Sequence, residues 1–251
     1  MTLLNVERIK LFSTRSPYWC LALIPVIGIA ITLITSLVDD GSFASLSSTQ
    51  GWAGFGQSVV MVMAALAITT EYRFGTIRTS FLAAPGRTGV IVAKAVLLGL
   101  LSLVTVWVTS AVTYLLGRTV HGSAAAESAF DIDGAGDWRV LWAPGVIAAL
   151  SAVLAIGVGA MVRQSAGAIA ILLLWPLLVE NLFLLFGEFG RKVQPWLPFS
   201  AGSAFLSENE GGGVGLGGGT TPTWWQGGLV FGATALVLFL LGLALVKRRD
   251  A

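Results

Sequence analysis

Six long stretches of apolar side chains limit this chain to one class of fold. A helix needs about 20 mostly apolar residues to cross the hydrocarbon core of a bilayer. Charged residues make up only 11% of the 251 residues, and a soluble core could not bury this much apolar surface. We therefore predict an all-α, polytopic membrane protein. It forms a single transmembrane domain over residues 1–251, with spans at 18–38, 52–70, 90–116, 141–162, 167–186 and 225–246.

The segment before the first span combines charged and apolar side chains at helical spacing. Leu4, Ile9 and Phe12 share it with Glu7 and Lys10. This pattern is typical of an amphipathic helix in the membrane interface, and not of a cleavable signal peptide. We expect an interfacial helix over residues 1–16.

The charges of the connecting segments indicate which span ends face the cytoplasm. With the N-terminus inside, most basic residues fall in cytoplasmic segments and most acidic residues in outer ones, as the positive-inside rule favours. We predict a multi-pass protein of the plasma (inner) membrane with both termini cytoplasmic. The basic residues inside are Arg8, Lys10, Arg15, Arg73, Arg78, Arg87, Lys94, Arg163, Lys247, Arg248 and Arg249, and the acids that remain there are Glu7, Glu71 and Asp250.

The cytoplasmic segment between the second and third spans carries the most specific pattern. Residues 71–87 read EYRFGTIRTSFLAAPGR, with Phe74, Ile77 and Phe81 at helical spacing. Pro85 and Gly86 end the element. The segment is therefore predicted to form a short amphipathic helix against the inner face of the membrane, although a basic patch that only fixes orientation and binds anionic lipid is an alternative.

The order Glu-x-x-x-Gly-Thr-Ile, then Phe-Leu-x-x-Pro and a downstream Ala-Lys, resembles the intracellular loop of ABC exporter permeases of the type-two superfamily. In that family the loop is a coupling helix, which docks on the nucleotide-binding subunit and transmits ATP-driven closure to the membrane helices. The resemblance is specific over residues 71–94, and elsewhere only the expected architecture supports it. The coupling residues that it implies are Glu71, Arg73, Phe74, Gly75, Thr76, Ile77, Arg78, Phe81, Leu82 and Pro85.

The resemblance also implies the assembly and the transport pathway. Two copies of an ABC ATPase subunit, which hold ATP and Mg, would bind a pair of permeases in the lipid bilayer, and the second permease would be identical or paralogous. A re-entrant element between spans five and six would be formed by residues 180–198, and residues 187–224 would make up the outer loop. Spans two and five line the pathway in relatives, which directs attention to Gln57, Ser58, Met61, Met63, Glu180, Asn181 and Phe183.

Two of these pathway assignments have structural alternatives. Met61 and Met63 could line a path for an amphipathic substrate or simply fill the core. Glu180 closes an apolar run, and an ionisable residue at membrane depth is a functional candidate by default. The same carboxylate could instead lie at the outer interface or cap the re-entrant element.

The sequence lacks the motifs of several other functions. No Gly-x-x-x-x-Gly-Lys-Ser/Thr motif occurs, so we expect that the chain is not an enzyme and that ATP is hydrolysed by a partner subunit. The acidic segment 131–137 fits a calcium loop poorly, because Ala135 and Trp142 stand at two ligand positions. We expect no metal site and no cofactor in this chain, and the net charge of +2 is too small to imply nucleic acid.

Two other classes of function stay open. One is an ATP-independent secondary transporter or channel, and the other is a membrane-anchored immunity or binding subunit that captures a peptide or lipid. The favoured prediction is export of an amphipathic drug, lipid or peptide.

Overall fold

A computed structural model describes residues 3–38, 45–76, 87–120, 130–207 and 220–249. This described part of the chain is helical and contains no β-strand. The longer helices are α1 (Leu3–Phe12), α2 (Ser16–Val38), α3 (Ala53–Arg73), α5 (Arg87–Val120), α7 (Ala135–Val162), α8 (Ser165–Leu174), α11 (Pro198–Leu206) and α12 (Trp224–Arg249). The shorter ones are η1 (Ser47–Gln50), η3 (Trp175–Val179), α9 (Glu180–Leu182), η4 (Phe183–Phe186), α10 (Gly187–Val193) and η5 (Gln194–Trp196).

Six helical runs are long and apolar enough to cross a membrane, which confirms the prediction of an all-α protein with six candidate spans. The runs are Ser16–Leu37, Ser47–Arg73, Thr88–Val120, Ala135–Val162, Ser165–Trp196 and Trp224–Arg248. Most of them extend past the predicted apolar stretches at one or both ends. The backbone hydrogen bonds of a helix continue past its apolar stretch, so hydropathy alone sets these boundaries too short.

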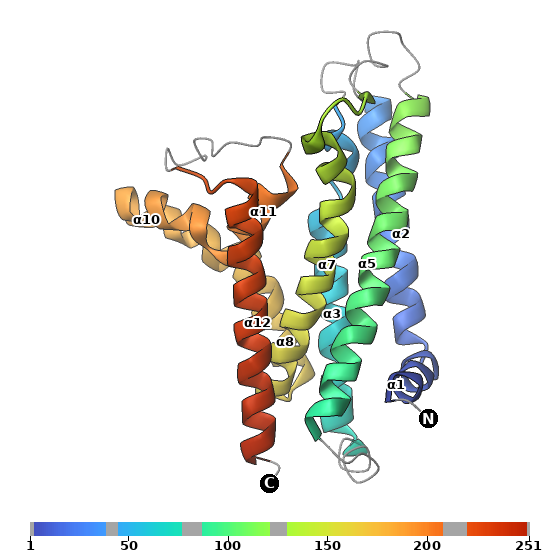
Figure 1. Cartoon of the computed structure of the whole chain (residues 1–251), viewed down its shortest axis with the longest axis vertical. Coiled ribbons are helices and arrows are strands. Elements are labelled where there is room, and N and C mark those ends of the chain that lie inside the picture. Colours follow the sequence, from blue (N-terminus) through green and yellow to red (C-terminus); the bar gives the residue numbers. More distant parts are fainter. Residues whose placement is uncertain (1–2, 39–44, 77–86, 121–129, 208–219, 250–251) are drawn as a thin grey trace.

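Helix α7 lies at the centre of the bundle and packs against α3, α5 and α12 (Figure 1). Its glycines allow the neighbouring helices to approach closely. A Cβ added at Gly157 would lie 2.6 Å from the carbonyl oxygen of Leu238 on α12, and one added at Gly145 would overlap the indole ring of Trp107 on α5. Small residues at helix contacts are the usual basis of such packing in membranes, where lipid removes the hydrophobic drive for helices to associate.

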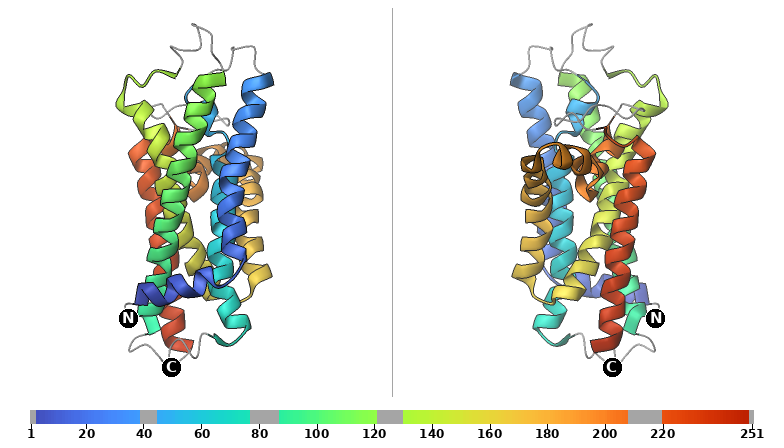
Figure 2. Two further views of the ribbon diagram at one scale, coloured as in Figure 1. Left: turned by 90° about the vertical axis from the view of Figure 1, so that its right-hand side faces the viewer. Right: turned by 90° about the vertical axis from the view of Figure 1, so that its left-hand side faces the viewer.

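Helix α1 lies across one end of the bundle, whereas α2 runs along it (Figure 2). We call this the basal end, because both described termini lie there. Leu4 and Ile9 of α1 are exposed, whereas Glu7 and Leu11 are buried. The face of α1 toward the protein thus carries both a charged and an apolar side chain, and part of its apolar surface faces outward.

The fifth apolar stretch is not one continuous straight helix. After α8 a π-helical turn, η3, contains Pro176, which cannot donate a backbone hydrogen bond. Gly187 then adopts a φ of 62°, a conformation that glycine accepts readily, and α10 turns away from α12 (Figure 1). The chain returns through η5 to α11, which packs on α12. This path is compatible with the re-entrant outer element, which stays a prediction.

The contact between α7 and α12 predicts opposite effects for two equivalent substitutions on α12. In Gly242→Ala the new methyl group would lie 2.7 Å from the carbonyl oxygen of Gly157, whereas in Gly232→Ala it would lie 3.8 Å from Leu150 Cδ1. Overpacking costs about 1–3 kcal/mol, and replacing a helical glycine by alanine gains up to about 1 kcal/mol. We expect Gly242→Ala to lower the Tm of the detergent-purified protein by several degrees and Gly232→Ala to leave it unchanged or raise it. Equal Tm values for the two variants would contradict this packing.

Candidate functional site at the basal end of the bundle

Four charged residues form a cluster where α1, α3 and α5 meet at the basal end. Lys94 Nζ on α5 lies 2.6 Å from Glu7 Oε2 on α1 and 3.0 Å from Glu71 Oε1 on α3. Lys10 Nζ, one turn along α1, lies 2.9 Å from Glu7 Oε1 and 3.6 Å from Glu71 Oε1. Each lysine therefore bridges the same two glutamates. We call these four residues the ion cluster.

The ion cluster is largely shielded from solvent. The side chains of Glu7 and Lys94 are 2% and 7% exposed, that of Glu71 is 11% exposed, and only Lys10 reaches 35%. An isolated charge at such burial would cost several kcal/mol, so these charges are tolerated because they are paired. The two positive and two negative charges cancel, which leaves the cluster formally neutral.

Residues next to Glu71 connect the end of α3 to a further element. The guanidinium of Arg163 lies 4.8 Å from the ring centroid of Tyr72, within the range of a cation–π contact. Thr69 Oγ1 and Ser165 Oγ are 2.8 Å apart. Arg163 caps α7 in a left-handed conformation with a φ of 60°, and Ser165 begins α8. The last turns of α3 thus contact α1, α5 and the turn between α7 and α8.

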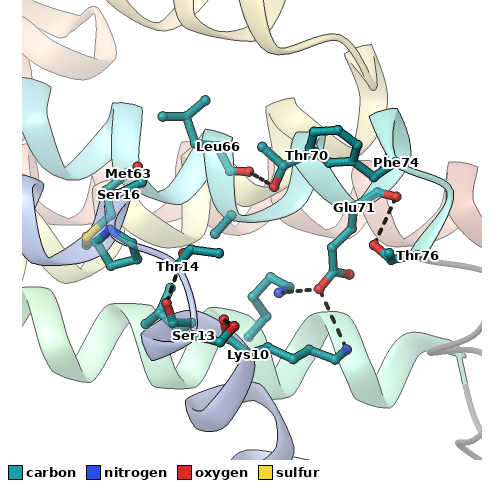
Figure 3. A pocket seen from close by; sticks show the side chains of 14 residues that line it. Lys10, Ser13, Thr14, Ser16, Met63, Leu66, Thr70, Glu71, Phe74 and Thr76 are labelled. Carbon is teal, nitrogen blue, oxygen red and sulfur yellow. Dashed lines mark hydrogen bonds and ion pairs between the residues drawn. The ribbon is translucent and has the colours of Figure 1, made fainter.

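A cavity of about 550 Å³ lies beside the ion cluster (Figure 3). Its walls come from the end of α1, the start of α2, the last turns of α3, the residues after α3, and α5. Charged, hydroxyl-bearing and apolar side chains all contribute to its lining. The lining residues are Lys10, Leu11, Ser13, Thr14, Ser16, Pro17, Met63, Leu66, Ala67, Thr70, Glu71, Phe74, Thr76 and Lys94.

Several of the residues predicted for ATPase coupling lie at this cavity. Glu71, Phe74 and Thr76 line it, and the guanidinium of Arg73 lies 5.7 Å from the Phe74 ring centroid. Gly75 has a φ of 69°, in the left-handed region, two residues after α3 ends. Residues 71–73 belong to α3 and not to a separate helix. Five further predicted coupling residues lie outside the described residues: Ile77, Arg78, Phe81, Leu82 and Pro85.

The predicted pathway residues on α3 do not share one cavity. Met63 lines the basal cavity, although its residue exposure is only 3%, and Met61 is buried in the core. Gln57 donates a 2.9 Å hydrogen bond to Ser151 Oγ on α7, while Ser58 donates to the carbonyl of Gly54. Within this subunit Met61 and Gln57 therefore contribute to helix packing.

Glu180 lies far along the chain from the cluster and caps a helix. Its carboxylate accepts hydrogen bonds from the backbone N–H of Phe199 at 2.9 Å and of Ser200 at 2.7 Å, and from Ser200 Oγ at 2.7 Å. Both N–H groups belong to the first turn of α11, where negative charge is favoured. Of the two interpretations of Glu180, the structure shows the cap. Nearby, Asn181 is exposed and donates to the Leu177 carbonyl, and the Phe183 ring packs near Phe186.

The acidic segment near residue 131 is also structural. Asp137 Oδ2 accepts hydrogen bonds from the backbone N–H of Asp133 and Gly134, and so caps the start of α7. Among the described residues, no group of three or more His, Cys, Asp or Glu side chains could hold a metal ion.

Sequence reasoning gave no role to Glu7 and only a motif position to Lys94. One signal was present, because Glu7 and Glu71 are acids on the predicted basic side and each needed a partner. The lysine that pairs with both could not be chosen from spacing alone, since Glu7 and Lys94 are far apart in the sequence.

No protein-family model matches this chain, and a search of curated proteins found no match to it. The arrangement of the basal end is therefore the basis for the functional argument.

The ion cluster predicts that losing one partner costs more than losing a balanced pair. Lys94→Met would leave Glu7 and Glu71 sharing Lys10, and breaking a buried ion pair costs about 3–5 kcal/mol. The double variant Glu7→Gln/Lys94→Met keeps the Lys10–Glu71 contact and removes one charge of each sign. We expect a large loss of unfolding free energy for Lys94→Met, measured by denaturant titration in detergent, and a smaller loss for the double variant.

Arg118→Met serves as the control for this prediction. Arg118 lies 4.0 Å from Asp131 in an exposed pair, so its loss should change stability little. Equal losses for Lys94→Met and Arg118→Met would show that the cluster does not hold the basal end together.

Proposed function

We propose that this chain is the membrane-spanning permease subunit of an ATP-driven exporter, with its ATPase on a separate subunit. The observation that carries the proposal is the set of bonds on the last turns of α3. Those turns lead directly into the segment predicted to dock the ATPase, and they contact α1, α5 and the α7–α8 turn.

The ion cluster offers a physical route from a docked ATPase to the membrane helices. A force on the segment after α3 acts first on Glu71 and Tyr72. Glu71 is paired with Lys94 on α5 and Lys10 on α1, while Tyr72 contacts Arg163 at the end of α7. Because the charges are buried and paired, separating them is costly, so the helices tend to move together. Rigid shifts of helices are a common form of conformational switching.

The rest of the proposed assembly follows the resemblance described above. Two permeases would enclose the pathway, and two ATPase subunits with ATP and Mg would bind at the basal end. The substrate would be amphipathic, and α3 and the fifth span would line its path. Exposed residues of the fifth stretch, such as Leu177, Leu185 and Phe186, offer apolar surface for the second permease or for lipid.

The proposal predicts the effect of two charges introduced into the coupling segment. The tagged chain is purified from its own cells, and any co-purifying protein with a Walker motif is assayed for ATP hydrolysis in proteoliposomes. We expect the double variant Phe74→Asp/Ile77→Asp to insert and to show an unchanged Tm, because Phe74 is 72% exposed. Its ATPase partner or the stimulated activity should be lost, since charge would replace the apolar docking surface.

The conservative variant Phe74→Leu/Ile77→Leu is the matched control and should retain coupling. Normal coupling in the aspartate variant would overturn the docking role of the segment. Failure to recover any Walker-motif ATPase with the wild-type chain would overturn the proposed function itself.

A further inference from the structure

Charged side chains lie at one end of the basal cavity. Glu71, Phe74 and Thr76 lie at its basal end, whereas Leu66 and Met63 lie progressively deeper along α3, with the hydroxyl-bearing Thr14 and Ser16 on the same side (Figure 3). Residues 63 and 73 are separated by about 15 Å along α3 at the usual helical rise. The cavity therefore has a charged end at the edge of the bundle and an uncharged end, lined by apolar and hydroxyl-bearing side chains, within the candidate span.

The deep part of the cavity suits a hydrocarbon chain. The apolar part of its lining consists of Leu11, Pro17, Met63, Leu66 and Ala67. The volume of about 550 Å³ lies within the range of small-molecule sites, which is about 300–1,000 Å³. A soluble polar ligand would leave this apolar lining uncovered, whereas an amphipathic ligand would cover it.

The most exposed charge at the cavity is positive. Lys10, Lys94 and Glu71 all line the cavity, but the side chain of Lys10 is 35% exposed, whereas those of Lys94 and Glu71 are 7% and 11% exposed and that of Glu7 is buried. Arg15 and Arg73 are exposed, and in the sequence they lie next to residues that line the cavity. The hydroxyl groups of Ser13 and Thr14 also line it, but each donates to a backbone carbonyl, of Lys10 at 2.7 Å and of Leu11 at 3.1 Å. The Lys10 ammonium is therefore the donor that an anion in the cavity would meet.

We propose that the cavity binds one anionic phospholipid, with its phosphate beside Lys10 and one acyl chain along Met63, Leu66 and Ala67. The phosphate accepts a hydrogen bond from the Lys10 ammonium. Basic pockets between helices at the cytoplasmic side of a membrane bind such head groups by the same chemistry. This site does not depend on the proposed export function.

The binding is tested by native mass spectrometry of the full chain after removal of bound lipid. Phosphatidylglycerol and phosphatidylcholine with identical acyl chains are titrated, and glycerol 3-phosphate tests the head group without chains. We expect one phosphatidylglycerol to bind with about tenfold preference over phosphatidylcholine and no detectable binding of glycerol 3-phosphate. Equal binding of the two lipids would overturn the proposal, and so would tight binding of glycerol 3-phosphate, which would indicate a free phosphate site.

Two variants locate the site by different means. Lys10→Gln should weaken phosphatidylglycerol binding about fivefold, as expected for one lysine near an anionic head group. Ala67→Phe fills the apolar part without touching the ion cluster, and should weaken binding about tenfold or more. Because Ala67→Phe leaves all charges in place, its result is informative even if Lys10→Gln fails to fold.

Matched controls carry the same changes outside the cavity. Arg248→Gln removes an exposed basic residue near the basal end of α12, and Ala233→Phe adds the same ring at an exposed position of that helix. Both should bind phosphatidylglycerol as the wild type does. If Arg248→Gln weakens binding as much as Lys10→Gln, or Ala233→Phe as much as Ala67→Phe, the lipid is held by general surface properties and the proposed site is wrong.

Discussion

Lys94 lies between two glutamates at the basal end of the bundle, and the positions of three helices depend on its ammonium group. Glu7 approaches it from α1 at 2.6 Å and Glu71 from α3 at 3.0 Å. None of these helices could bury its charge alone, because an unpaired ion away from water is costly. Lys10 then balances the second glutamate. A helix that lies across the bundle is thus fixed to two helices that run along it.

The same requirement accounts for the polar contacts elsewhere in the bundle. Within the fifth stretch, Glu180 caps the start of α11 by accepting three hydrogen bonds. Near the far end of α5, Trp52 and Gln50 bond to Thr113 and thereby join η1 to α5. In each case a polar group that would be unsatisfied in lipid joins two separate elements. The apolar helix surfaces fit together through glycines, and these polar contacts fix their register.

The apolar runs were enough to predict six candidate spans, because a helix that crosses a membrane needs about 20 mostly apolar residues. They could not predict the π-helical turn η3 within the fifth run, since hydropathy carries no information on backbone geometry. The sequence left Glu180 with either a role in the transport pathway or a structural role. Its hydrogen-bond donors lie on α11, and only the fold brings them within 3 Å of the carboxylate. The candidate site could be predicted only in part for the same reason. The motif pointed to Glu71, whereas the pairing of Glu7 with Lys94 is evident only in the folded structure.

The ion cluster and the cavity beside it share residues, so a ligand in the cavity acts on the same side chains that join α1, α3 and α5. Lys10, Glu71 and Lys94 contribute to both, and a ligand phosphate near Lys10 would compete with Glu7 and Glu71 for its ammonium group. Any weakening of the Lys10–Glu71 contact loosens α1 from α3. Lys94 on α5, which contacts both Glu7 and Glu71, then remains as the residue that joins the two helices. Binding at the cavity and movement of the segment after α3 would then be coupled in both directions, because a coupling free energy between two sites is reciprocal. The lipid environment and a protein docked at the basal end would in this way act on the same few charges.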